Sequence, residues 1–148
     1  MPDTRLNPYL NFNGNTREAM TFYAQVLGGK LEIMTFGAFP GAPDEIKDQV
    51  MHARLDAGDM TLMASDPPPG GTVTHGDAMS ISLSGSDAAT LKGYWEKLLP
   101  GAQVVMPLET QMWGDTFGML KDRFGVQWMV NIAAARAYLC KTCGTNSP

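Results

Sequence analysis

The sequence predicts an α+β protein made of two tandem βαβββ modules, which together form a curved mixed sheet around a cleft. Three observations predict this fold. Short segments with alternating apolar and polar residues indicate half-buried strands, and two segments with apolar residues at helical spacing indicate amphipathic helices. The order of these segments repeats with a period of roughly seventy residues. A segment rich in proline and glycine, residues 67–76, separates the two copies.

The first module is expected over residues 1–66, with strands at 7–13, 30–36, 49–56 and 60–65. Between the first two strands, apolar residues recur at helical spacing from Ala19 to Leu27, and the pair Gly28-Gly29 ends the helix. Asn15 or Thr16 is expected to cap its N-terminus. The loop over 37–48 contains prolines and glycines and is predicted to be irregular.

The second module is expected over residues 77–132, starting with a strand at 79–83 and a helix capped by Ser86 or Asp87. A strand at 103–108 follows, and a hairpin over 112–132 turns at residues 122–125. Residues 133–148 are predicted to be a tail. Its Cys140 and Cys143 are too few for a structural zinc site, and we interpret them as incidental thiols.

Composition narrows the functional classes. The chain has 148 residues, enough for one domain or two small fused modules. Its formal net charge of −4 argues against binding to a nucleic acid. We find no run long enough to span a membrane and no signal peptide, and therefore expect a cytoplasmic protein without a membrane partner. Phosphate-loop, dinucleotide and nucleophile-elbow motifs are missing as well.

The alternation also assigns residues to faces of the strands. One side, including Leu10, Phe12, Ala53, Leu55 and Leu62, is expected to face the helices, and the other to line the cleft. With the aromatic residues of the C-terminal hairpin added, the candidate substrate-binding residues are Tyr9, Asn11, His52, Arg54, Met63, Ser80, Ser82, Trp113, Phe117 and Trp128. The alternative for the hairpin aromatics is that they only pack the core.

This wall of aromatic, methionine and hydroxyl side chains suits a small, partly apolar ligand with one polar or anionic end. Arg54 could hold a carboxylate or a phosphonate with two parallel hydrogen bonds, or could simply pair with a surface carboxylate. His52, two residues away on the same face, is the candidate catalytic base, with an ordinary hydrogen-bonded strand histidine as the alternative.

Several motifs carry a family resemblance. The duplicated βαβββ pattern, together with Phe22-Tyr23-Ala24-Gln25-Val26-Leu27-Gly28-Gly29, resembles the glyoxalase/bleomycin resistance/extradiol dioxygenase (vicinal oxygen chelate) superfamily. The similarity is to its PhnB-like branch, often labelled 3-demethylubiquinone-9 3-methyltransferase-like. The motifs behind this are Pro8-Tyr9-Leu10-x-Phe12-x-Gly14, His52-Ala53-x-Leu55, Trp113-Gly114-Asp115 and Asp122-x-Phe124-Gly125-x-x-Trp128.

The resemblance implies where a metal would sit. Metal enzymes of this superfamily carry one ligand on the first and one on the last strand of each module, and those places fall approximately on Tyr9, Met63, Ser80 and Val130. None of these is a usual ligand of a divalent metal. We therefore expect no metal and no cofactor. A site built from His52, His75 and a carboxylate such as Glu109 is the alternative.

The hypothesis that follows is a metal-free protein of the glyoxalase/bleomycin-resistance type that binds a small molecule in the cleft between its modules. One alternative is a metal- or His52-dependent enzyme, an isomerase, lyase or transferase acting on a small oxygenated substrate. Another is a structural homodimer module with a filled cleft. Resembling proteins are often homodimers, so we expect a homodimer here.

Overall fold

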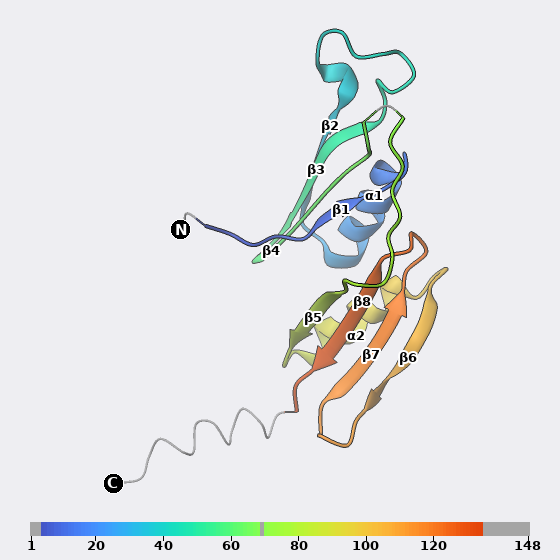
Figure 1. The fold of residues 1–148 in the computed structure, drawn as a ribbon. Coiled ribbons are helices and arrows are strands. Elements are labelled where there is room, and N and C mark those ends of the chain that lie inside the picture. Colours follow the sequence, from blue (N-terminus) through green and yellow to red (C-terminus); the bar gives the residue numbers. More distant parts are fainter. Residues whose placement is uncertain (1–3, 69, 135–148) are drawn as a thin grey trace. The chain divides into compact units, whose positions relative to one another are not determined.

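The structure is a computed structural model that describes residues 4–68 and 70–134 (Figure 1). The chain divides into two compact units, Met1–His75 and Gly76–Pro148. Within the described residues, each unit contains one four-stranded sheet and one α-helix. The predicted tail lies outside the described residues from position 135 on, as do Cys140 and Cys143.

The first unit has the sheet order β1-β4-β3-β2. Strands β1 and β4 run parallel, and the other neighbours run antiparallel. Helix α1 packs against the sheet, mainly against β3 (Figure 1). The elements are β1 (Tyr9–Asn11), α1 (Thr16–Leu27), β2 (Lys30–Thr35), the 3-10 turn η1 (Phe36–Ala38), β3 (Val50–Ala57) and β4 (Met60–Ser65).

The second unit repeats this plan with the sheet order β5-β8-β7-β6, in which β5 runs parallel to β8 (Figure 1). Its elements are β5 (Ile81–Gly85), α2 (Ala88–Leu98), β6 (Gln103–Thr110), β7 (Thr116–Lys121) and β8 (Gln127–Ile132). Because both units place the last strand beside the first and the helix between the first two strands, the predicted α+β fold of two tandem βαβββ modules is confirmed.

The core of the first unit follows from the helical spacing in α1. Its buried side chains include Ala19, Met20, Tyr23 and Val26. Tyr23 lies four positions after Ala19 and three after Met20, and Val26 follows three positions later, which places all four on one face of the helix. The helix ends at Gly28, which has φ 76°. Gly29 follows with φ 93°, and a side chain there would overlap the backbone of β3, so only glycine lets the chain pass this close.

The two helices begin in different ways. Asp87 caps α2 as predicted, because its side chain accepts a hydrogen bond from the Thr90 amide at 3.2 Å. The expectation for α1 was wrong, since Asn15 at its N-cap makes no capping bond. Asp66 takes that role from fifty positions away, with Oδ1 accepting from the amide of Thr16 at 3.1 Å and from its hydroxyl at 2.6 Å.

The segment rich in proline and glycine contains neither helix nor strand in its described part. Two side-chain contacts attach its end to the first unit. The Asn13 carboxamide exchanges two hydrogen bonds with the backbone of Val73, at 2.7 and 2.8 Å. His75 Nε2 donates to the carbonyl of Asn11 at 2.6 Å. Residues up to His75 therefore belong to the first compact unit.

None of the helices in the described parts of the chain combines the length and the apolar character that crossing a membrane would need.

Candidate functional site

Each sheet has one face that packs against its helix and one face that does not, which we call the open face. In β3, Ala53, Leu55 and Ala57 are buried, so the alternating His52 and Arg54 lie on the first open face. The register of the neighbouring strands adds further members, because Tyr9 of β1 lies beside Met63 of β4, and Met63 beside Arg54. The first open face therefore contains Tyr9, Asn11, His52, Arg54 and Met63, as the sequence indicated.

Tyr9 and His52 form a pair on this face. The Tyr9 hydroxyl and His52 Nδ1 are 3.1 Å apart, and the ring centroids are 5.7 Å apart. If the hydroxyl donates, the imidazole carries its proton on Nε2; if Nδ1 donates, Nε2 is the acceptor. Within the described residues no hydrogen bond to Nε2 is formed. The pair can thus present either a donor or a base to a molecule on the open face.

Arg54 is held by a neighbouring carboxylate. Its Nε donates to both oxygens of Asp56, at 3.1 and 2.9 Å. The hydrogen bond and the opposite charge of Asp56 raise the pKa of Arg54, and the hydrogen bond from Arg54 lowers the pKa of Asp56. The alternative that Arg54 pairs with a surface carboxylate is confirmed. Since these contacts use only Nε, two parallel hydrogen bonds from its terminal nitrogens to a ligand stay a prediction.

The second open face is defined in the same way. Gly118 and Leu120 of β7 are buried, so Phe117 and Met119 lie on the open side. Strand pairing aligns Met106, Met119, Met129 and Ser82 in one row across β6, β7, β8 and β5. The three methionines of this row form a flexible, apolar stripe across the face, and the Ser82 hydroxyl lies at its end.

Two aromatic residues and a second serine border this stripe. The rings of Trp113 and Phe117 are 6.5 Å apart, and Trp113 is 64% exposed. Ser80, just before β5, donates from its hydroxyl to Gln127 Oε1 at 3.1 Å. The sequence-predicted residues Ser80, Ser82, Trp113 and Phe117 thus gather on or beside the second open face.

The predicted position of Trp128 is wrong. Its side chain is 1% exposed and lies on the helix side of β8, in register with the buried Leu120, and its indole N–H donates to Asp122 Oδ2 at 2.8 Å. Val130 is also fully buried on that side, beside Gly118. A residue larger than glycine at 118 would collide with the Trp95 ring of α2, which confirms that this side faces the helix.

The corrected register changes the comparison with metal-ligand positions. Tyr9 and Met63 are direct partners on β1 and β4, but the partner of Ser80 is Gln127 and not Val130. Among residues 4–68 and 70–134, no three His, Cys, Asp or Glu side chains form a group that could hold a metal ion. His75, proposed in the alternative site, instead bonds to β1 and lies edge-on to Phe12 at 5.5 Å.

Sequence reasoning missed four residues of the second open face, Met106, Met119, Gln127 and Met129, and two buried structural carboxylates, Asp66 and Asp122. The alternation that starts at Gln127 was the signal for the open-face residues. Asp115 holds a loop by accepting hydrogen bonds from the Ala134 amide at 3.0 Å and from Asn131 Nδ2 at 3.1 Å. These two bonds lower its pKa.

The duplicated βαβββ plan is the fold of the glyoxalase/bleomycin resistance superfamily. A bleomycin-binding protein complexed with bleomycin has the same fold, with a TM-score of 0.56 over 88% of this chain and 98% of that chain at 19% identity. The sequence profile described as 3-demethylubiquinone-9 3-methyltransferase matches residues 4–131, so the chain belongs to this family. The resemblance to the PhnB-like branch is confirmed.

Three relatives illustrate the similarity. The crystal structure of protein PA1353 from Pseudomonas aeruginosa is 44% identical, with a TM-score of 0.81 over 89% of this chain and 99% of that chain. A PhnB protein from Bacillus cereus is 25% identical, with a TM-score of 0.72 over 88% of this chain and 100% of that chain. Protein YjdN from Escherichia coli K12 is 26% identical over 139 residues, which are 86% of this chain and 94% of the relative.

Proposed function

We propose that this protein binds a small, partly apolar molecule on the open faces of its sheets, and that it does so without a metal ion. The observation that carries the proposal is the chemistry of these faces. On the first open face, the half-buried Met63 lies near the Tyr9–His52 pair. The second open face carries the exposed Trp113 and the half-buried Phe117, together with the hydroxyl groups of Ser80 and Ser82. An apolar surface bordered by polar groups is typical of a ligand-binding site.

The side chains favour a particular kind of ligand. Methionine sulfur and aromatic rings make favourable contacts with other rings, and the flexible thioether adapts to different outlines. The nearby polar groups could orient a ligand's polar end. The bleomycin-binding protein complexed with bleomycin, which has this fold, supports binding of a small molecule by this architecture.

The metal-free part of the proposal rests on the residues present at the strand positions. Tyr9 and Met63 form one cross-strand pair, and Ser80 and Gln127 form its counterpart in the second unit. Thioether, neutral amide and hydroxyl groups are weak ligands for divalent ions, which prefer imidazole, thiolate and carboxylate groups. The structure describes each unit by itself, so the expected cleft between the two modules stays a prediction.

Tryptophan fluorescence tests the binding proposal. Of the three tryptophans, Trp95 and Trp128 are 7% and 1% exposed, so quenching by an added ligand would report mainly on Trp113. We expect saturable quenching by at least one member of a panel of quinones, aromatic antibiotics and phosphonates, with weaker binding in Phe117→Ala. If Trp113→Phe leaves every quenching signal unchanged, the site has been placed wrongly.

A second candidate function is supported by the contact between Tyr9 and His52. A histidine whose Nδ1 is held by a hydroxyl and whose Nε2 faces the open side can act as a general acid or base. The substrate would then be a small oxygenated molecule that gives up or accepts a proton. Any turnover found should fall about a hundredfold or more in His52→Ala, since proton transfer by a positioned side chain typically contributes about 10²–10⁴-fold. Unchanged turnover would exclude this role.

The expected homodimer belongs with these proposals. Light scattering coupled to gel filtration would show a mass of about twice the 16.0 kDa of one chain. A dimer that binds nothing in the fluorescence panel would support the third hypothesis, a structural module with a filled cleft.

A further inference from the structure

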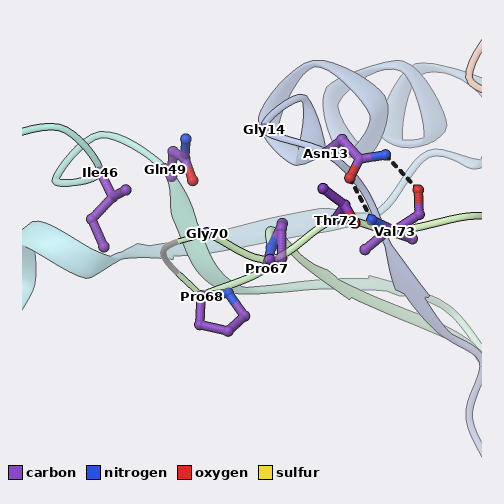
Figure 2. Close-up of a pocket in the computed structure, with 10 residues that line it drawn as sticks. Asn13, Gly14, Ile46, Gln49, Pro67, Pro68, Gly70, Thr72 and Val73 are labelled. Carbon is purple, nitrogen blue, oxygen red and sulfur yellow. Dashed lines mark hydrogen bonds between the residues drawn. The ribbon is translucent and has the colours of Figure 1, made fainter.

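A separate hollow lies at one end of the first sheet, where β1 and β4 end and β3 begins (Figure 2). Its volume is about 360 Å³, within the range typical of pockets for small ligands. It is lined by Asn13, Gly14, Ile46, Gln49, Pro67, Pro68, Gly70, Gly71, Thr72 and Val73. None of these residues belongs to the candidate site on the open faces.

None of the described residues that line the hollow is charged. Asp66, which precedes Pro67 in the chain, is 4% exposed and already accepts four hydrogen bonds, from Gly14, Thr16 and Val50. A charged ligand would therefore lose water without gaining an opposite charge. The hollow favours a neutral molecule.

Two polar side chains on the lining, those of Gln49 and Thr72, have hydrogen-bonding capacity to offer. Both ends of the Asn13 carboxamide are used by Val73, but the half-buried Gln49 carboxamide makes no hydrogen bond within the described parts of the chain. Its nitrogen would lie only 3.8 Å from a Cβ placed at Gly14, so it stands close to the wall of the hollow. A free carboxamide offers one acceptor and two donor hydrogens side by side.

The remaining side chains provide apolar walls. In the view of Figure 2, Ile46 and Gln49 lie on one side and Val73 on the other, with Pro67 and Pro68 between them. Proline rings are rigid, so these surfaces lose little entropy when a ligand covers them. Flat apolar walls beside a free carboxamide match a planar ring that carries an amide.

We propose that this hollow is a second binding site, and that it takes a small neutral planar molecule with an amide or lactam group, in which a carbonyl and an N–H lie side by side. The Gln49 carboxamide forms two reciprocal hydrogen bonds with that group, and the ring lies against the proline side chains. The site is independent of the open faces, so it stands even if the proposed function fails.

Nicotinamide and nicotinate test this proposal because they share a ring and differ in the group that Gln49 would bind. Nicotinamide carries the neutral amide, whereas nicotinate carries a charged carboxylate without a donor. In an NMR titration of the whole chain we expect nicotinamide to shift the amide signals of Thr72 and Val73 in a saturable way. Nicotinate should bind at least tenfold more weakly.

Gln49→Leu keeps the approximate size of the side chain but removes the carboxamide, and Gln49→Glu keeps its shape but removes the donors. Both should weaken nicotinamide binding at least tenfold. The matched control is Gln25→Leu, on the exposed side of α1, which should bind as the wild type does. Equal binding of the two probes, no binding of nicotinamide, or unchanged affinity in either folded Gln49 variant would overturn the proposal.

Discussion

Replacing Asp66 by alanine should destabilise the first unit strongly. The wild-type carboxylate is 4% exposed and accepts four hydrogen bonds, from the amides of Gly14, Thr16 and Val50 and from the Thr16 hydroxyl. It therefore joins the end of β1, the start of α1 and the start of β3. In Asp66→Ala these donors keep their buried positions and lose their acceptor.

The magnitude follows from these contacts. A hydrogen bond to a charged group contributes about 1.5–3 kcal/mol, and a lost helix cap alone costs about 1 kcal/mol. Because the four bonds share one acceptor and are not additive, we expect the free energy of unfolding to fall by about 3–5 kcal/mol, at the upper end for single substitutions. With a urea slope of about 2 kcal/mol per molar, the midpoint should shift by roughly 2 M.

The assay can separate the two units. All three tryptophans, at positions 95, 113 and 128, lie in the second unit, so their fluorescence reports its unfolding. Amide hydrogen exchange in α1 reports the first unit, and we expect its protection to be lost in Asp66→Ala. The exposed Asp48→Ala is the control. The reasoning fails if Asp66→Ala costs less than about 1 kcal/mol, the usual range of surface substitutions, or behaves like the control.

Three further predictions concern the fold. Gly28→Ala and Gly29→Ala both place alanine at positive φ, but only Gly29→Ala places a methyl group against the backbone of β3. In a urea titration, Gly29→Ala should therefore lower the free energy of unfolding by at least about 1–3 kcal/mol more than Gly28→Ala does. The pKa of Asp115 is lower in the folded state than in the unfolded chain, so its charged form stabilises the fold at pH values above the ordinary carboxyl pKa. This stabilisation is lost as the pH falls through the lowered pKa of the folded state. Urea midpoints measured below pH 5 should therefore depend less on pH in Asp115→Asn than in the wild type. Trp128→Phe removes the hydrogen bond to Asp122, so thermal unfolding should show a loss of about 1–3 kcal/mol of stability while ligand affinity stays unchanged. A loss of affinity without a loss of stability would instead show that Trp128 contacts the ligand.

The fold could be predicted because its signals are local. Alternation placed Ala53 and Leu55 on the helix side and His52 and Arg54 on the other, and the structure has them there. The repeated order of strands and helix required no knowledge of distant contacts. A pattern that occurs twice in one chain leaves few other arrangements.

The candidate site was predictable only in part, because alternation shows which residues share a face of a strand but not which of the two faces packs against the helix. Trp128 was assigned to the cleft as an aromatic residue that suits a pocket, but its ring also suits a core when the N–H finds a partner. That partner is Asp122, in the turn between β7 and β8. The alternation in β8 groups Trp128 with Val130, and both side chains lie on the helix side.

The role of Asp66 depends on contacts that no local pattern contains. Its partners at Gly14 and Thr16 are about fifty positions earlier in the chain. From the sequence alone, an aspartate that precedes three prolines indicates only a turn. In the folded chain this turn contacts the start of α1, and only the three-dimensional structure shows that contact.

Ligand binding in the absence of divalent ions tests the central proposal most directly. Trp113 emission would be titrated with each member of the quinone, antibiotic and phosphonate panel, first in protein treated with a chelator and then after addition of Mn²⁺, Ni²⁺ or Zn²⁺. We predict saturable quenching in the chelated protein, with dissociation constants that the added ions leave unchanged. Quenching that develops only after a divalent ion binds at one equivalent per chain would contradict the account, as would a panel in which nothing binds.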